Sequence, residues 1–388
     1  MNLDLTEDQT QIRDAVRELC RGEFASQAAK WDSDDAIPAS AIAKLADIGL
    51  LGMNVPEEWG GLGYDSRTVS MVIEEIARVS ASLAIMVSVH NSVGAYPIYA
   101  FGTDEQRRRY LPRLTTGAVG AFSLSESDSG SDASALTTTA RRVPAEGGSG
   151  DHYVLTGEKN WVTNGHHTWT FLVMARTGEA GPNGISAFII ENDQKGLTIG
   201  KSEDKMGLRG SDTVTLAFDG ARVPVSQRLG GEGEGFKIAL KSLDAGRIGV
   251  ASQALGVMTA AFHAAARYAQ QRKAWGGPIA KLQAIQFKLA EMERRVQAAR
   301  LLIQKAAWLK DTGRDFIRAA SMAKLYATEA ATWVTHQAIQ VHGGYGYVKE
   351  YAVERYYRDA RVMEIYEGTS EIQRLVIARS LLRDGVRL

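Results

Sequence analysis

The segments that favour β-strands are confined to the middle of this chain, between residues 151 and 224. Short runs of β-branched and aromatic residues recur there, at 152–155, 170–174, 185–190 and 213–218. Turn signals such as Gly181-Pro182-Asn183-Gly184 separate these runs, as is typical of neighbouring antiparallel strands. On either side, apolar residues recur at helical spacing, most extensively from Ala245 to about Gln271 and from Leu282 to about Leu309. This order of segments favours segregated domains over a doubly wound sheet.

We therefore predict an α+β protein with three domains. Residues 1–117 would form an N-terminal helical domain, residues 118–230 a middle antiparallel β domain of sandwich or barrel type, and residues 231–388 a C-terminal helical domain. A chain of 388 residues is long for a single hydrophobic core, which agrees with this division. The glycine-rich segment from Gly230 to Gly235 lacks the context of a phosphate-binding loop, and we interpret it as a hinge between two domains.

The N-terminal third carries clear helix signals. Thr6 with Gln9, and Thr103 with Gln106, have the spacing of capping boxes, so a helix should begin after each threonine. The stretch from Ser66 to His90 is apolar and rich in small residues, which predicts a buried pair of helices.

Charge and cysteine content limit the classes of partner and compartment. Lysine and arginine together number 45, as do aspartate and glutamate, so no basic field favours nucleic acid or an anionic membrane. The single cysteine, Cys20, rules out an internal disulfide framework. No uncharged apolar run is long enough to span a bilayer, and the first residues lack the pattern of a signal peptide. We expect a cytoplasmic protein, or a mitochondrial matrix protein if a transit peptide has been removed.

The histidines and serines do not form the patterns of a metal site or of a hydrolase active site. His166 and His167 are adjacent, whereas His336 and His342 are too far apart for one helical turn, and no cysteine or carboxylate lies at ligand spacing. We therefore predict no metal site. The Gly-x-Ser-x-Gly elbow of many hydrolases is also missing from the sequence.

A stretch near the C-terminus has the features of a catalytic turn. A helical pattern ends at the paired glycines Gly343 and Gly344. Ser370 and Gln373 have capping-box spacing, which predicts the start of a last helix. Glu367 then lies just before a helix N-terminus, between an aromatic residue and a glycine. A carboxylate held there could act as a base, although a glutamate in a loop is most often a solvated surface residue.

Two polar or aromatic motifs lie in the middle domain. Residues Phe122 to Asp132 are dense in hydroxyl groups, which suits either a flexible linker or a hydrogen-bonding frame for a polar ring system. The segment Trp161-Val162-Thr163-Asn164 suits either a half-buried tryptophan of a sheet or a flat wall beside a planar cofactor. The residues alone leave both choices open.

Taken in order, these motifs resemble those of the acyl-CoA dehydrogenase family. The C-terminal stretch matches the family signature nearly residue for residue, at Gln340 to Tyr347, Arg355 to Arg361 and Ile365 to Gln373. Further matches cover essentially the whole chain, at Lys205 to Ser211, Leu243 to Ala251, Arg272 to Ile279 and Lys281 to Gln286. The run from Asp244 to Leu255 and the C-terminal stretch are most similar to the short-chain, butyryl-type enzymes.

The resemblance implies FAD-dependent oxidation of an acyl-CoA to the trans-2-enoyl-CoA, with electrons passed to electron-transfer flavoprotein. Glu367 would remove the α-proton while the β-hydrogen leaves as hydride to the flavin. Ser131, Asp244, Arg247 and Gly368 would contact the substrate. The resemblance also implies a homotetramer built as a dimer of dimers, and a role in fatty acid β-oxidation or branched-chain amino acid degradation.

The resemblance also implies which residues bind FAD. A group that we call the flavin set would line the ring: Phe122, Leu124, Ser125, Gly130, Ser131, Trp161, Val162 and Thr163. A second group, the adenine set, would bind the adenine-diphosphate end across a subunit interface: Arg272, Gln283, Gln340, Val341, Gly343 and Gly344. Three residues at the start of the last helix and just before it would complete the site: Thr369, Ser370 and Glu371.

Three positions bear on the choice within the family. Isovaleryl-type relatives carry the base at the position of Gly246, so here Glu367 is the remaining candidate. Ser127 stands where proline is usual and Trp275 where phenylalanine is usual, and neither change removes a group that the reaction needs. The alternatives are an acyl-CoA oxidase or desulfinase on the same scaffold, or a non-catalytic relative that protects nucleic acid. The length and branching of the acyl chain stay open.

Overall fold

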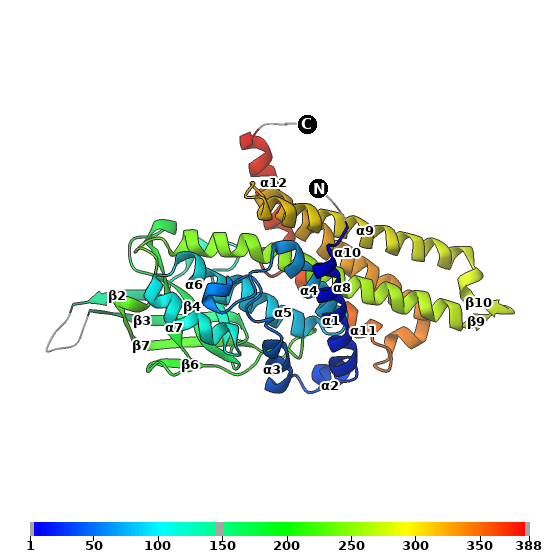
Figure 1. The fold of residues 1–388 in the computed structure, drawn as a ribbon, viewed down its shortest axis with the longest axis horizontal. Coiled ribbons are helices and arrows are strands. Elements are labelled where there is room, and N and C mark those ends of the chain that lie inside the picture. Colours follow the sequence, from blue (N-terminus) through cyan, green and yellow to red (C-terminus); the bar gives the residue numbers. More distant parts are fainter. Residues whose placement is uncertain (1–3, 145–150, 385–388) are drawn as a thin grey trace.

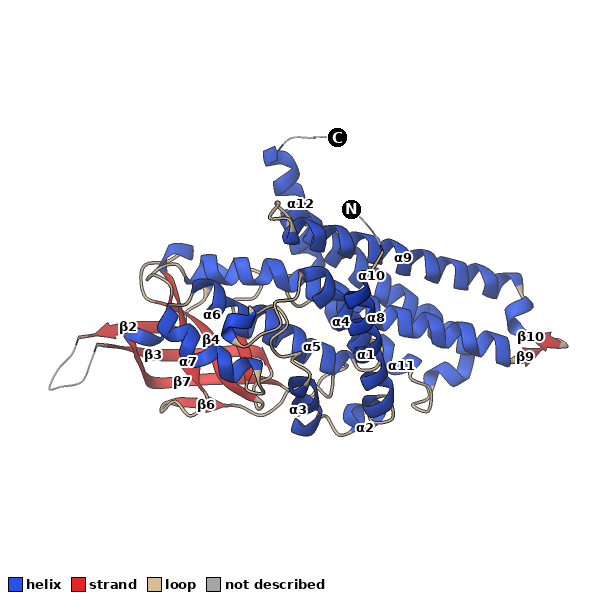
Figure 2. Ribbon diagram, in the orientation of Figure 1, coloured by secondary structure: helices blue, strands red, loops and turns tan. Residues whose placement is uncertain are grey.

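The computed structural model describes residues 4–144 and 151–384 and shows helices, then a sheet, then helices along the chain (Figure 1). Figure 2 shows the strands of the large sheet gathered at one end of the molecule, and the long C-terminal helices extending to the other. The predicted α+β class is confirmed. The domain boundaries at 117 and 230 stay predictions. Residues 1–3, 145–150 and 385–388, which fall in the three predicted domains, lie outside the described residues.

The N-terminal part is helical, as predicted. Both predicted capping boxes form, at Thr6 with Gln9 and at Thr103 with Gln106. The buried pair predicted between Ser66 and His90 corresponds to α4 and α5, which are separated by a short turn. The helices are α1 (Glu7–Leu19), α2 (Ala28–Ser33), α3 (Ala39–Asp47), α4 (Ser66–Ala77), α5 (Ala81–Val89), α6 (Tyr96–Phe101) and α7 (Asp104–Thr115).

Within the described residues the middle part forms one eight-stranded sheet in the order β6-β7-β3-β2-β4-β5-β8, with β1 paired to β4. Most neighbours are antiparallel, as predicted, but β4 runs parallel to both β1 and β2. The sequence did not show this because these strands are joined by long connections and not by hairpins. The strands are β1 (Val119–Ser123), β2 (Thr139–Val143), β3 (His152–Thr163), β4 (Thr168–Arg176), β5 (Ile185–Glu191), β6 (Leu197–Ile199), β7 (Thr213–Pro224) and β8 (Arg228–Leu229).

The C-terminal part is a bundle of long helices. Helix α10 ends at His342, where Gly343 takes a φ of +60°, as the paired glycines predict. Helix α8 is long and apolar enough to cross a membrane by length and composition, but 78% of its apolar window is buried inside the protein, so it serves as a core helix. The elements are α8 (Gly235–Gln271), β9 (Lys273–Ala274), β10 (Gly277–Pro278), α9 (Gln283–Asp311), α10 (Ile317–His342), α11 (Val353–Arg361) and α12 (Ser370–Asp384).

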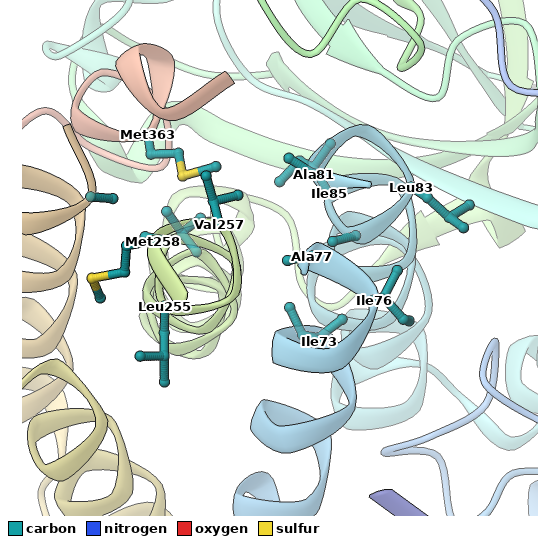
Figure 3. Close-up of a cluster of buried hydrophobic side chains, with 14 of the residues drawn as sticks. Ile73, Ile76, Ala77, Ala81, Leu83, Ile85, Leu255, Val257, Met258 and Met363 are labelled. Atoms are coloured by element: carbon teal, nitrogen blue, oxygen red, sulfur yellow. The ribbon is translucent and has the colours of Figure 1, made fainter. Parts of the chain in front are cut away.

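The main core lies where α8 packs against the N-terminal helices (Figure 3). Ile73 and Ile76 of α4 are fully buried in the same cluster as Val257 and Met258 of α8. The two helices approach closely because Gly256 has no side chain, since a Cβ there would lie 2.4 Å from the carbonyl oxygen of Glu74. Interiors are close-packed, so this contact fixes α8 relative to the N-terminal helices.

A buried histidine connects the N-terminal helices to the sheet. His90 shares a hydrogen bond of 2.7 Å from Nε2 to the carbonyl oxygen of Leu51, and its Nδ1 accepts one of 2.9 Å from the backbone N–H of Gly120 on β1. Burial lowers the pKa of His90 to about 4, so the ring is neutral and Nε2 is the donor. The ring therefore holds the start of the sheet against the loop that follows α3.

A second buried contact holds the segment after β1 to β3. The Lys159 ammonium donates to Glu126 Oε1 at 2.7 Å and to the carbonyl oxygen of Leu124 at 3.2 Å. The side chain of Lys159 is 0% exposed and that of Glu126 is 6% exposed. Burial raises the pKa of Glu126, but Lys159 and bonds from Thr137 and Thr138 outweigh it and lower the pKa to about 2. This ion pair therefore fixes the backbone of Leu124 and its neighbours.

We expect Lys159→Met to lower the free energy of unfolding by about 3 kcal/mol or more, because it leaves the buried Glu126 carboxylate without its cation. Chemical denaturation at neutral pH would measure this loss. Arg142→Met is the matched control, because Arg142 on β2 pairs with Asp151 at 2.8 Å while its side chain is 53% exposed. An equal loss of stability in both variants would contradict the structural role given to the buried pair.

Candidate active site

Glu367 lies in a turn with an unusual backbone just before α12. Its φ is +54° and that of Gly368 is +89°. A left-handed conformation costs a residue other than glycine on the order of 1–3 kcal/mol, so neighbouring contacts must hold it. The side-chain amide of Gln373 donates to the carbonyl oxygens of Glu367 at 3.3 Å and Gly368 at 2.9 Å, and Lys324 Nζ donates to that of Gly368 at 2.8 Å. The turn is thus held from α10 and α12 together.

The Glu367 carboxylate faces the protein interior. The residue as a whole is half-buried, but its Oε2 is buried and has no hydrogen-bond partner among the described residues. Burial raises the pKa of Glu367 to about 7, although Arg247 and Lys324 act to lower it. The carboxyl group therefore has a free acceptor atom and changes its charge near neutral pH, as a general base requires.

Gly246 provides the space that this carboxylate occupies. A Cβ on Gly246 would lie 2.6 Å from Glu367 Oε2, which is closer than real side chains allow. The predicted substrate residues Asp244 and Arg247 flank Gly246 on α8 and form an ion pair of 2.7 Å. The structure thus brings together Glu367, Asp244, Arg247 and Gly368, as predicted.

Tyr366, the residue before the candidate base, is also anchored. Its hydroxyl group hydrogen-bonds Gln253 Oε1, and the Gln253 amide donates to the carbonyl oxygen of Ala81 at 2.8 Å. Gln253 is fully buried on α8, while Ala81 begins α5. This chain of bonds connects the turn to two core helices, so its position follows that of the core.

The capping box predicted at Ser370 and Gln373 is wrong. The hydroxyl group of Thr369 accepts from the backbone N–H of Ile372 at 3.3 Å, while Ser370 Oγ is buried without a partner among the described residues. The positive φ angles of Glu367 and Gly368 bring their carbonyl groups over the first turn of α12, where they accept from the Gln373 amide instead. Helix α12 still begins at Ser370, as predicted. Of the three residues that the resemblance assigns to the end of the FAD site, Thr369 is half-buried, Ser370 is buried and Glu371 is exposed.

The two motifs of the flavin set lie side by side. The backbone N–H of Asn160 donates to the carbonyl oxygen of Ser125 at 2.9 Å, which joins the loop after β1 to the end of β3. Trp161 has a φ of +62° and is 65% exposed, so it is not the half-buried sheet residue of the alternative interpretation. Val162 is fully buried and Thr163 is half-buried. An exposed indole ring on a strained backbone, beside hydroxyl groups, suits a planar ligand.

Other members of the flavin set vary in exposure. Gly130 and Ser131 are exposed, and Leu124 is buried. Phe122 is half-buried and packs against the same two hydrophobic clusters as Leu243, the neighbour of Asp244. The flavin set and the Glu367 site therefore border the same seam between the helices and the sheet.

Five residues of the adenine set line one groove of about 840 Å³: Arg272, Gln340, Val341, Gly343 and Gly344. The guanidinium group of Arg272 lies 5.6 Å from the centre of the Tyr345 ring. A Cβ on Gly343 or Gly344 would meet nothing within 4 Å, so a ligand can approach this backbone. Trp275, which is 86% exposed, also lines the groove. An arginine and open backbone among aromatic rings suit a nucleotide diphosphate.

The two FAD-binding sets are not brought together within one chain. Figure 1 shows the β9–β10 hairpin, which directly follows Arg272, at the end of the molecule opposite the large sheet. Gln283, at the start of α9, is not among the residues that line the groove. A cofactor that needs both sets would therefore be bound between two copies of the chain, which is the arrangement that the family resemblance implies.

Sequence reasoning missed Lys324 and the role of Gln373. Lys324 is fully buried on α10, and its ammonium group holds the turn of the candidate base. A signal existed, because Lys324 is a single charge in a helical run of alanine, serine and methionine that should face the core. Its partner, a backbone carbonyl group 44 residues later, could not be read from the sequence.

Comparisons with known proteins show the family of this chain. Three family models match consecutive parts of the chain: the N-terminal domain of acyl-CoA dehydrogenase over residues 6–118, the middle domain over 121–221 and the C-terminal domain over 233–382. The short-chain specific acyl-CoA dehydrogenase, mitochondrial, of Bos taurus is 48% identical over 384 residues, which cover 98% of this chain and 92% of that protein.

Two solved structures share the whole fold. Butyryl-CoA dehydrogenase from Megasphaera elsdenii has a TM-score of 0.96 and 40% identity, covering 99% of this chain and 100% of that chain. A chain from a structure described as the electron transferring flavoprotein of Acidaminococcus fermentans has a TM-score of 0.96 and 44% identity, with the same coverage. The chain belongs to the acyl-CoA dehydrogenase family.

Proposed function

We propose that the protein oxidises a short-chain acyl-CoA, straight or branched, to the trans-2-enoyl-CoA and passes the electrons to electron-transfer flavoprotein. The observation that carries this proposal is the buried Oε2 of Glu367, which faces the position of Gly246 and has no hydrogen-bond partner in the described part of the chain. The likeness to a butyryl-CoA dehydrogenase and to a short-chain specific enzyme supports a short acyl chain. The likeness to a chain from a structure of an electron transferring flavoprotein supports the electron acceptor.

The family is FAD-dependent, and the residues present fit this cofactor. The flavin set of one copy would hold the ring, because it offers the exposed Trp161 beside Ser125 and Thr163. The adenine set of another copy would hold the diphosphate with Arg272 and the open backbone at Gly343. When bound there, FAD supplies the acceptor for the hydride that leaves the β-carbon.

In this proposal Glu367 removes the α-proton. The α C–H bond breaks, its proton passes to the carboxylate, and a carbon–carbon double bond forms as the β-hydrogen leaves with its electron pair. Because burial favours the neutral acid, the carboxylate is a stronger base than an exposed glutamate. The negative charge that develops on the thioester oxygen needs a hydrogen-bond donor. The backbone N–H of Glu367 is suited to this task, because it has no acceptor among the described residues.

The separation of the two FAD-binding sets also supports an assembly of several copies, for which we propose a dimer of dimers. Large apolar side chains near the groove support this proposal, since Trp275 and Tyr347 are 86% and 87% exposed. A partner copy that covers them would complete the cofactor site. The cytoplasmic location stays a prediction of the sequence.

The function is tested by anaerobic titration of the purified yellow protein with butyryl-CoA. We expect immediate bleaching of the flavin absorbance band, because substrate oxidation reduces the cofactor. Isobutyryl-CoA, 2-methylbutyryl-CoA and octanoyl-CoA would then define the preferred chain. Failure to bleach with every acyl-CoA would refute the proposed reaction. Hydrogen peroxide release in air, without an added acceptor, would favour an acyl-CoA oxidase.

We expect kcat/KM to rise about tenfold per pH unit below pH 7 and to level off above it, because Glu367 must be ionised and burial raises its pKa to about 7. Steady-state rates with butyryl-CoA across this range would measure the profile. Glu367→Gln is the control, because it keeps the shape of the side chain and removes the base. This variant should bind FAD and ligand but lose turnover by about three orders of magnitude or more at every pH. Near-normal turnover would refute the assignment of the base.

We expect Gly246→Ala to lower kcat at least tenfold while the melting temperature stays equal or rises. The new Cβ must displace the Glu367 carboxylate, which it would otherwise approach to 2.6 Å, whereas alanine favours helix α8 by about 1 kcal/mol over glycine. Thermal denaturation and turnover would be measured together. Gly22→Ala is the control, because a Cβ on this helical glycine meets nothing within 4 Å. Unchanged turnover in Gly246→Ala would contradict the observed contact.

A further inference from the structure

We propose that Lys324 is a positioning residue for the base, a buried cation that holds the Glu367–Gly368 turn and supplies positive charge opposite the Glu367 carboxylate. This inference rests on the proposed role of Glu367 in proton removal. It assigns a distinct task to a side chain on α10 that belongs to neither FAD-binding set.

The environment of Lys324 is unusual for an ammonium group. The side chain is 0% exposed, and its Nζ donates to the carbonyl oxygen of Gly368 at 2.8 Å. Lys324 forms no ion pair with any described carboxylate, and two of its three N–H donors have no hydrogen-bond partner among the described residues. Burying an unpaired charge is costly, and lysine is almost never fully buried without a partner. This cost points to a role that a neutral side chain would not fulfil.

The charged groups around the site show which cation is available to Glu367. On α8, Arg247 already pairs with Asp244 at 2.7 Å. Glu364, whose charge also acts to raise the pKa of Lys324, accepts a hydrogen bond from Thr332 Oγ1 and lies 3.8 Å from an arginine of α11. Lys324 is therefore the buried cation near Glu367 that has no carboxylate partner of its own.

Two other titratable groups, Glu371 and Tyr366, lie near Lys324 and Glu367. Glu371, on α12, is exposed to solvent and screened accordingly. Tyr366 stays protonated, because burial raises its pKa well above the usual value. Burial lowers the pKa of Lys324 to about 8, although Glu367 raises it, so the ammonium form persists at neutral pH. A charged Lys324 thus coexists with an ionised Glu367 before the proton is transferred.

The structure provides its own matched control, because two donors share the carbonyl oxygen of Gly368. Lys324 Nζ lies 2.8 Å from this oxygen and Gln373 Nε2 lies 2.9 Å from it. Both side chains hold the turn, but Lys324 alone carries a charge. Loss of either donor should loosen the turn, whereas loss of Lys324 alone should also remove positive charge from Glu367.

The test compares Lys324→Met and Lys324→Gln with Gln373→Met in the FAD-loaded protein. We expect the pH midpoint of kcat/KM to rise by about one unit in both lysine variants, which is a tenfold loss on the acidic side, because removing a cation favours neutral Glu367. In Gln373→Met, kcat should fall while the midpoint stays unchanged. Lys324→Arg, which retains the charge, should restore the original midpoint.

A second readout does not depend on turnover. Infrared difference spectra against Glu367→Gln isolate the carboxylic acid stretch of Glu367, and its titration should shift to higher pH in the neutral lysine variants. An unchanged midpoint in the lysine variants, or an equal shift in Gln373→Met, would overturn the inference while the proposed function still stands. Full turnover in Glu367→Gln would instead overturn the assignment of Glu367 as the base, on which the inference rests, and failure of the FAD-loaded protein to bleach with every acyl-CoA would overturn the proposed function. If Lys324→Met does not fold, Lys324→Gln and Lys324→Arg decide the question.

Discussion

The burial of one carboxylate in a left-handed turn is the constraint on which the site depends. Removing the Glu367 carboxyl group from water raises its pKa, and this makes it a useful base near neutral pH. The same burial requires that its backbone be held in a costly conformation and that its free oxygen atom have room. Each neighbouring feature of the site either holds this backbone or leaves space for the oxygen atom.

The helices around the turn meet these two requirements with small residues, which leave space, and with buried polar groups, which hold the backbone. Gly246 leaves space for the carboxylate, and Gly256 lets α8 approach α4 closely. Lys324 and Gln373 hold the backbone from α10 and α12. Because each contact joins elements far apart in the sequence, the site forms only when the helical core is complete. The candidate base therefore occupies a defined position and not one of several loop conformations.

The proposed cofactor site would depend on contacts between two chains as well as within one. The flavin set lies at the end of β3, against the seam that also contains Leu243, whereas the adenine set lies beside the β9–β10 hairpin. In the proposed function, a single chain would offer one FAD molecule either the flavin set or the adenine set, but not both. Cofactor binding and assembly would then stabilise each other, since a ligand held by two subunits favours their association.

The local features of this protein could be predicted from its sequence. The long helices, the strands β3, β4, β5 and β7, the capping boxes at Thr6 and Thr103 and the helix end at Gly343 follow from spacing and from the conformations that a few residues allow, whereas β1 and β2 lie outside the predicted β runs. The resemblance of whole motifs identified the family and proposed Glu367 as the base. Only the tertiary structure decided the parallel pairing of β4 with β1, the contact of Gly246 with the carboxylate and the burial of Lys324. These depend on which distant segments meet and on how much water they exclude, and neither quantity is encoded in the spacing of neighbouring residues.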